Sequence, residues 1–269
     1  MRTIDSSAAW YPLSGTMLRR TGLGLGLTLG LLLAGCGAPA TENETAPDDE
    51  FDPGSLAQLQ SGVTVCARGS TLPGIDVSYY QGAINWAQVK GAGIKFAIIR
   101  VSDGTGFMDP KFESNWTGSK AQGVVHGTYQ FFRPGQSATA QADIVINNLR
   151  KVGFGAKDIP PVLDVEVTDG QSNDKIAAGI RTWVSRVTAA LGRKPLVYTS
   201  PGFWSSRGNP TIKGTSLWVA HWGVSCPNAP STWPGWEFWQ YSATGRVPGI
   251  VGDVDLDKFN GTLAELQSL

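Results

Sequence analysis

The sequence is poor in metal-binding residues and carries no net charge. Its 269 residues include two histidines, three cysteines, and equal numbers of acidic and basic side chains, 22 of each. Neither an H-E-x-x-H nor a C-x-x-C spacing occurs, which disfavours a zinc peptidase or amidase. Zero net charge gives no support for nucleic acid as a partner. We therefore expect neither a nucleic-acid partner nor a metal or other cofactor.

Other catalytic signatures are also missing. The chain has no G-x-S-x-G nucleophile elbow and no phosphate-binding glycine loop, and Gly104 and Gly106 in SDGTG form a lone turn. No internal repeat and no second folded domain are evident. Because the nucleophile elbow and the phosphate-binding loop are missing, nothing indicates serine-hydrolase or nucleotide chemistry.

Long hydrophobic runs are scarce, and the main one lies near the N-terminus. Arg19 and Arg20 precede an uncharged stretch over residues 21–35, which is short for a membrane span and typical of a signal-peptide core. It ends in Leu-Ala-Gly-Cys at Cys36, which resembles a bacterial lipobox and implies cleavage before Cys36 and lipid attachment to it. We expect residues 1–35 to be a lipoprotein signal peptide, with Met17 as a candidate start; an uncleaved anchor helix is the alternative.

Residues 36–62 then comprise the lipidated cysteine and a disordered tether, because they are rich in proline, acidic and small side chains. The catalytic domain is expected over residues 63–269. The cysteines that remain, Cys66 and Cys226, either pair in the oxidising compartment that export implies or stay free. We expect a monomer that is exported and anchored through Cys36 to the membrane of a bacterial envelope, the outer membrane if the source is Gram-negative.

Short apolar runs alternate with helical patterns in the rest of the chain. The strands are predicted at residues 74–78, 96–101, 124–132, 161–167, 195–200, 217–221, 237–241 and 253–256. The helices are predicted at residues 86–92, 110–122, 138–152 and 175–191, with no convincing helix among the later strands. This order favours a single-domain α/β protein, an incomplete TIM-like β/α barrel of about five β/α units followed by strands without helices.

Two carboxylates interrupt the most apolar of these strands, IPPVLDVEVTDG. Asp164 and Glu166 are two residues apart, so both point to one face with Cα atoms about 6.5–7 Å apart. Crowded carboxyls keep one member protonated beside an ionised one, which suits cleavage of a glycosidic bond. Asp76 and Asp255 also lie near the C-terminal ends of predicted strands, where β/α barrels place their chemistry. The alternative is that each acid caps a helix or pairs with a lysine or arginine.

A family resemblance rests on several ordered segments within residues 73–262. They are GIDVSYYQGAINWAQVKGAGIKFAIIRVSDGTGFMDPKFESNW, GTYQFFRP, PPVLDVE, PLVYTSPGFW, LWVAHW and FWQYSATGRVPGIVGDVDLDKFNG. In these the chain resembles glycoside hydrolase family 25, the Chalaropsis-type lysozymes, which are N-acetylmuramidases. The resemblance implies that peptidoglycan glycan strands are the partner and that the β-1,4 bond between N-acetylmuramic acid and N-acetylglucosamine is cut with retention.

The resemblance also implies roles for the acids. Glu166 would be the general acid, and Asp164 either the nucleophile or the carboxylate that orients the substrate acetamide. Asp76 and Asp255 would line the same cleft and tune its charge or hold sugar hydroxyls. The open alternatives are a non-catalytic peptidoglycan-binding envelope lipoprotein and a hydrolase of another N-acetylhexosamine polymer.

Several aromatic side chains are candidates for the cleft, and two positions differ from the family. We expect Tyr129, Tyr198 and Trp222 to line the cleft, since pyranose rings stack on aromatic faces, and Gln240 to hydrogen-bond sugar. Structural positions are expected for Trp86, Trp183, Trp218, His126 and His221. The family commonly has His at Gln130, which would alter the network beside Tyr129, and Asn at Asp257, where the extra charge is expected to be solvated.

Overall fold

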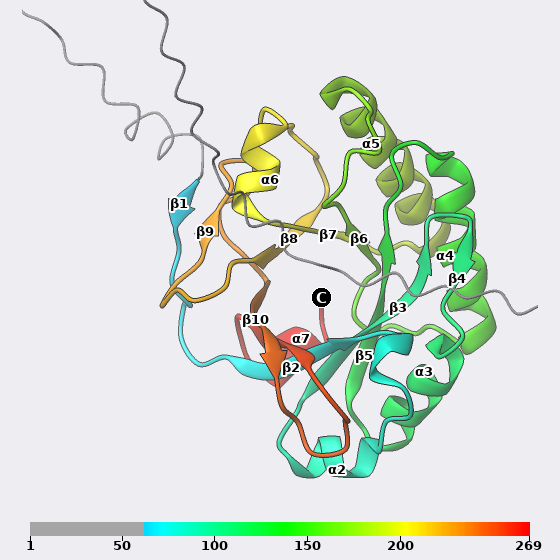
Figure 1. Cartoon of the computed structure of the whole chain (residues 1–269), viewed down its shortest axis with the longest axis vertical. Coiled ribbons are helices and arrows are strands. Elements are labelled where there is room, and N and C mark those ends of the chain that lie inside the picture. The colour runs from blue at the N-terminus through cyan, green and yellow to red at the C-terminus, as the bar shows by residue number, and fades with distance from the viewer. Residues whose placement is uncertain (1–61) are drawn as a thin grey trace, which may run out of the picture. The chain divides into compact units, whose positions relative to one another are not determined.

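A nine-stranded sheet closes into a barrel in the computed structural model, which describes residues 62–269 (Figure 1). Strand β2 (Leu72–Val77) pairs with β3 (Phe96–Asp103) and closes the ring, while β4 (Phe107–Met108) extends from β3. The other strands are β5 (Val125–Phe131), β6 (Val162–Asp164), β7 (Leu196–Thr199), β8 (Ser216–Ala220), β10 (Phe238–Gly245) and β11 (Val254–Phe259). The predicted signal peptide and tether, with Cys36, lie outside the described residues.

The major helices follow the strands as the sequence predicts. They are α2 (Trp86–Gly91), α3 (Phe112–Ala121), α4 (Ala138–Val152) and α5 (Asn173–Leu191). Three of these, α3 to α5, lie together along one side of the barrel in Figure 1. The shorter elements are η1 (Tyr79–Gln81), α7 (Leu263–Leu266) and a separate two-stranded sheet of β1 (Val63–Thr64) and β9 (Asn228–Ala229).

Helix α5 shows why the periodic segments could be predicted. Its N-cap, Ser172, accepts a hydrogen bond from the backbone of Lys175, and it ends at Gly192, whose φ of 66° is left-handed. Ile176, Ile180, Trp183 and Val187 are buried along one face of this helix. Among residues 62–269 no helix combines the length and apolar character needed to cross a bilayer.

Helix α6 (Pro201–Ser206) was not predicted, nor were the short elements η1 and α7. Helix α6 begins after Ser200, whose side chain accepts from the backbone of Phe203, and it has proline in its first turn. The expectation of helix-free connections after β7 is therefore wrong. With six residues, α6 is too short to show a 3.6-residue period. Its only sequence signals are the N-cap serine and the proline in its first turn.

The last strand runs against its neighbours. Strand β11 is antiparallel to both β10 and β2, whereas β2, β3, β5, β6, β7, β8 and β10 are parallel to their other neighbours in the ring. Residues 246–253 form too short a link for a parallel crossover, so the chain reverses there. Asp255 accordingly lies at the beginning of β11, not near its C-terminal end as predicted, and still lies at the mouth formed by the C-terminal ends of the other strands.

Alternation along the strands divides the core in two. Ala97, Ile99 and Val101 pack with helix residues between the barrel and its outer layer. Phe96 and Ile98 belong to a second cluster, made largely of strand residues, that fills the barrel interior. Leu266 of α7 joins this interior cluster, so α7 closes the end of the barrel opposite the mouth.

Candidate active site

The mouth is built around a carboxyl pair on β2 and β11. Asp76 lies directly opposite Asp255 in the antiparallel register, which directs both side chains to the same face. Asp76 is 5% exposed, and its Oδ2 accepts a hydrogen bond from Nε2 of Gln240 at 2.8 Å. Burial, followed by the charges of Asp255 and Asp257, holds the pKa of Asp76 well above its usual value. Burial also raises the pKa of Asp255 to about 6.

Asp257 adds a third carboxyl to this group. It lies two residues beyond Asp255 on β11, is completely buried, and accepts from Nε1 of Trp218 at 2.9 Å. Its other oxygen, Oδ2, has no hydrogen-bond partner among residues 62–269. Burial and then the charge of Asp255 raise the pKa of Asp257 well above normal. The expectation of a solvated charge here is wrong, because barrel closure covers this face of β11.

Gln240 links these carboxyls to the cleft wall. While its Nε2 donates to Asp76, its Oε1 accepts from the hydroxyl of Tyr198 at 2.9 Å and from Nε1 of Trp222 at 3.1 Å. Gln240 is 4% exposed. Its amide is therefore oriented by three protein partners, and it fixes the direction of two aromatic side chains; its contact with sugar stays a prediction.

The predicted acid pair lies across the mouth. Strand β6 ends at Asp164, shorter than predicted, so Glu166 follows the strand instead of lying within it. Asp164 is 5% exposed, and its Oδ1 has no hydrogen-bond partner in the described part of the chain. Burial and then the charge of Glu166 raise the pKa of Asp164 well above its usual value.

Glu166, in contrast, is open to solvent. The protein walls around it nevertheless raise its pKa, and the charge of Asp255 raises it further. Arg133, held by Asp103 through contacts of 2.5 and 2.7 Å, opposes this shift. Glu166 can therefore hold a proton in a position that a ligand can reach.

The hydroxyl of Tyr198 lies close enough to all four predicted acids to be affected by their charges, so the acids share one mouth. Burial raises the pKa of its hydroxyl well above normal, and charges on Asp164, Glu166, Asp76 and Asp255 add to that effect. The Tyr198 ring packs edge-on against Trp218 with 4.7 Å between ring centroids. The alternative, that each acid caps a helix or forms an ion pair, is not what the described residues show.

Tyr129, on β5, also lies beside Trp218 and close to the acids. Its ring centroid is 6.2 Å from that of Trp218, and burial followed by the charge of Asp76 raises the pKa of its hydroxyl well above normal. Tyr129 is only partly buried. Tyr129 therefore lies near the acids, and its place in a substrate cleft stays a prediction.

An open cleft of about 540 Å³ adjoins the acids. It is lined by Glu166, Tyr198, Ser200, Pro201, Gly202, Phe203, Ala220, His221, Trp222 and Asn228. Trp222 is 55% exposed here, so its ring presents a free face. A flat aromatic wall beside a protonatable carboxyl can bind a sugar ring while donating a proton to its linkage.

The two histidines have different surroundings. His126 is buried, with Nδ1 hydrogen-bonded to the carbonyl oxygen of Val124, and it packs against Trp116. His221, expected to be structural, lines the cleft, and its Nδ1 accepts from the backbone of Asn228 at 3.0 Å. Burial lowers the pKa of His221, which favours the neutral imidazole.

Two arginines near the acids escaped the sequence interpretation. Arg100 is buried, pairs with Asp109 at 3.0 Å, and stacks against Tyr79 at 5.0 Å. The charges of Arg100 and Arg133 both lower the pKa of Asp164, partly opposing the effect of burial. No local pattern marks these residues, since their partners come from other strands and loops.

Trp86, Trp183 and Trp218 are buried, as expected for packing positions. Gln130 is also buried; it accepts from Nε1 of Trp183 at 2.7 Å and donates to Ser102 at 2.8 Å. The departure at Gln130 therefore serves the packing between the barrel and α5.

A larger groove, about 1000 Å³, lies between α4 and α5, away from the acids. Its carboxylate, Asp143, is already paired with Arg186 through contacts of 2.5 and 2.9 Å. Because Arg186 already neutralises this carboxylate, size alone does not make this groove the reactive site.

Buried carboxyls of raised pKa at a barrel mouth, beside an aromatic cleft, suit the chemistry of a glycoside hydrolase. A family model described as "Glycosyl hydrolases family 25" matches residues 75–250, which is more than half of the chain. The protein belongs to glycosyl hydrolase family 25.

Individual relatives agree with this assignment. Lysozyme M1 of Streptomyces globisporus is 41% identical over 210 residues, covering 74% of this chain and 71% of its own. The N,O-diacetylmuramidase of Chalaropsis sp is 33% identical over 203 residues, covering 69% and 96%. The crystal structure of a bacterial lysozyme from Streptomyces coelicolor superposes with a TM-score of 0.69 at 41% identity, covering 74% of this chain and 97% of the other.

Proposed function

We propose that this protein is an N-acetylmuramidase, which hydrolyses the β-1,4 bond between N-acetylmuramic acid and N-acetylglucosamine in peptidoglycan. The observation that carries the proposal is the pair Asp164 and Glu166, both of raised pKa, beside the aromatic cleft. The names of the relatives, lysozyme and N,O-diacetylmuramidase, support the choice of substrate.

Glu166 acts as the general acid. It is open to the cleft, and its raised pKa supplies the proton that the leaving glycosidic oxygen takes up. Asp164 faces the forming positive charge, either attacking the anomeric carbon or orienting the substrate acetamide to attack it. Both routes pass through two displacements and therefore retain the anomeric configuration.

The neighbouring residues hold the substrate. Asp76 and Asp255 set the charge of the mouth and accept hydrogen bonds from sugar hydroxyls. Stacking surfaces come from Tyr129, Tyr198 and Trp222, and Gln240 fixes the last two. A saccharide thus lies along the aromatic wall with its scissile bond at Glu166.

The test is digestion of purified peptidoglycan. We expect wild-type protein to release new muramic acid reducing ends, and Glu166→Gln to lose activity by about a hundredfold or more while still pelleting with the wall. Wild type that pellets with the wall but releases no reducing ends would establish the non-catalytic binding alternative. Cleavage of chitin oligosaccharides in preference would instead indicate another N-acetylhexosamine polymer as substrate.

Two further measurements distinguish the possible mechanisms. Proton NMR of the first-formed anomer distinguishes retention from inversion. A glycan whose reacting sugar lacks the N-acetyl group still reacts if Asp164 attacks directly, and does not if the acetamide attacks.

We further propose that residues 1–35 are a signal peptide and that Cys36 carries a lipid, so that a monomer acts in the cell envelope. The Leu-Ala-Gly-Cys sequence supports this. The mass of the mature N-terminus tests it, because an unmodified Cys36 or another first residue would exclude the anchor. We also class the barrel as an incomplete TIM-like barrel, since α2 to α6 each join consecutive barrel strands whereas β10 and β11 are joined without a helix.

A further inference from the structure

The first described residues pair with a segment that lines the cleft. Strand β1 pairs antiparallel with β9, placing Val63 opposite Ala229 and Thr64 opposite Asn228 (Figure 1). Oγ1 of Thr64 also donates to Oδ1 of Asn228 at 2.8 Å. Since Asn228 lines the cleft, this N-terminal segment contacts the substrate site from behind.

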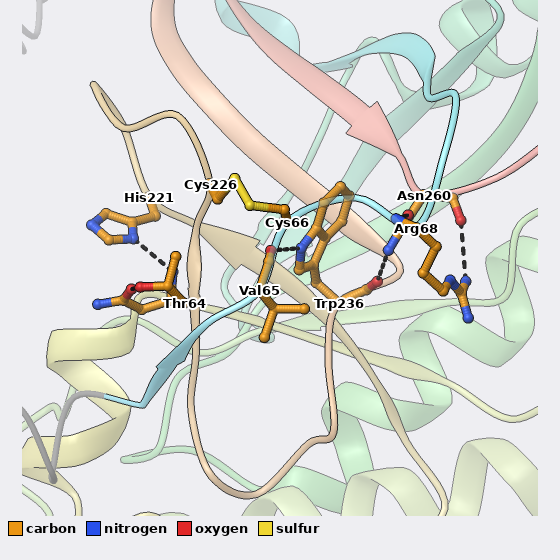
Figure 2. The surroundings of a disulfide bond; sticks show 9 residues. Thr64, Val65, Cys66, Arg68, His221, Cys226, Trp236 and Asn260 are labelled. Carbon is orange, nitrogen blue, oxygen red and sulfur yellow. Dashed lines mark hydrogen bonds between the residues drawn. A yellow bond between two sulfur atoms is a disulfide. The ribbon is translucent and has the colours of Figure 1, made fainter.

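A disulfide joins the same two segments. Cys66 and Cys226 are 160 residues apart in the sequence, and their Cα atoms are 4.8 Å apart. Beside the disulfide, the backbone N–H of Val65 donates to the carbonyl oxygen of Pro227 at 2.9 Å. The carbonyl oxygen of Val65 accepts from Nε1 of Trp236 at 2.7 Å, as Figure 2 shows. The segment is thus attached to the loop on one side and to the buried Trp236 on the other.

The loop held in this way carries the cleft wall. His221 and Trp222 begin it and Asn228 ends it, and all three line the cleft. Residues 222–225 are exposed, so the loop has little core packing of its own. Its closure is fixed by the Asn228 backbone N–H donating to Nδ1 of His221 at 3.0 Å, the bond drawn as a dashed line at His221 in Figure 2.

We propose that the Cys66–Cys226 disulfide and β1 form a brace that positions His221, Trp222 and Asn228, so that tight substrate binding requires the closed disulfide. A two-residue strand at the beginning of a domain frays readily when no covalent bond retains it. The disulfide holds Cys66 close to Cys226, so that β1 stays paired with β9. Without the disulfide the loop gains conformations, and substrate binding must then remove them. Cys66 and Cys226 are therefore positioning residues, which act through the wall and touch no reacting atom.

The brace depends on the oxidation state of Cys66 and Cys226. Reduction by a dithiol such as dithiothreitol transfers two electrons and two protons to the sulfurs of Cys66 and Cys226, while the reagent closes its own disulfide. Both enzyme sulfurs become thiols and the brace opens. Affinity for glycan is then linked to the redox state of the surroundings, whereas the acids at the mouth stay in place.

The test rests on the proposed function and uses soluble peptidoglycan fragments of alternating N-acetylglucosamine and N-acetylmuramic acid. For the double variant Cys66→Ser, Cys226→Ser we expect KM to rise about threefold to tenfold with kcat nearly unchanged, the pattern of lost uniform binding. The matched control is Arg68→Ala, because Arg68 belongs to the same segment but contacts Asn260 and Glu237 away from the cleft. Its KM should equal that of wild type. An unchanged KM in the double variant, or a fall in kcat alone, would overturn the brace.

If the double variant does not fold, reversible reduction of wild-type protein provides the same test. Wild-type protein is reduced, checked by circular dichroism, assayed and reoxidised; a KM that rises and then returns supports the brace, and one that never changes refutes it. Thr64→Val, which keeps the disulfide but loses the bond to Asn228, should give a smaller rise.

Hydrogen exchange separates failure of the brace from failure of the proposed function, because it needs no substrate. On reduction, we expect faster exchange at the amide of Asn228, while the amides of β3 stay protected. If wild type cuts no peptidoglycan but this exchange still responds to reduction, the proposed function fails and the brace stands. If the exchange is unchanged, the brace fails whatever the substrate is.

Discussion

Asp76 and Asp255 face each other directly across strands β2 and β11, although they are far apart in the sequence. Neither carboxyl is easily ionised there, because burial raises both pKa values and the charge of Asp255 raises that of Asp76 further. Asp255 also raises the pKa of Glu166 on the other side of the mouth. The pair thus helps to set the pH at which the proposed general acid retains its proton.

Replacing Asp255 should therefore move the pH profile. In Asp255→Asn the neighbouring negative charge is gone, Glu166 ionises more easily, and the basic limb of kcat/KM shifts to lower pH by roughly half a unit to one unit. Asp143→Asn is the control, since Asp143 pairs with Arg186 in the groove between α4 and α5, away from the acids, and its side chain is 40% exposed. A basic limb that stays in place or moves to higher pH would contradict the assigned coupling.

Replacing Asp257 should stabilise the protein at alkaline pH. Because its folded-state pKa is raised, its contribution to stability is complete below the unfolded pKa of about 4 and is lost as the pH rises through the folded value. Asn cannot ionise, yet it can still accept from Trp218 and donate to Asp76. In thermal melts we expect Asp257→Asn to gain about 1–3 kcal/mol over wild type at pH 8, and much less at pH 4. A larger gain at pH 4 than at pH 8 would refute this.

Trp222 should contribute mainly to binding. We expect Trp222→Ala to raise KM for soluble glycan about tenfold, because it removes the exposed stacking face. Trp222→Phe keeps an aromatic face but loses the bond to Gln240, and should raise KM less. Initial-rate kinetics over a range of substrate concentrations measure both. Equal effects of the two substitutions would show that the hydrogen bond, not stacking, is what matters.

Barrel closure should be sensitive at Gly74. A Cβ at this position would lie 2.2 Å from the ring of Phe96, which is fully buried and packs edge-on against Phe238. We expect Gly74→Ala to lower the free energy of unfolding by about 1–3 kcal/mol, as overpacking of a core does. Urea denaturation measures the change. Gly91→Ala is the control: nothing lies within 4 Å of its Cβ, so its stability should be nearly unchanged.

The parts of the site that could be predicted are those written in short segments. Asp164 and Glu166 stand out because charges rarely interrupt so apolar a strand. The face of α5 was evident from its 3.6-residue period and its caps. Helix α6 was missed because six residues give no period.

What escaped prediction depended on long-range pairing. The direction of β11 put Asp255 at the beginning of its strand, and barrel closure buried Asp257, which alternation alone would leave ambiguous. His221 joined the cleft because the loop after it is held back by β1 and the disulfide.

By itself, the sequence determined where the longer helices and most strands form, which faces are apolar, and that a carboxylate pair lies near a strand end, because these depend on neighbours a few residues apart. Only the tertiary structure decided that Asp76, Asp255 and Asp257 meet, and that Cys66 reaches Cys226 behind the cleft. Those contacts join residues about 160 to 180 positions apart, and their existence depends on strand order, direction and register, which follow from closing the whole barrel.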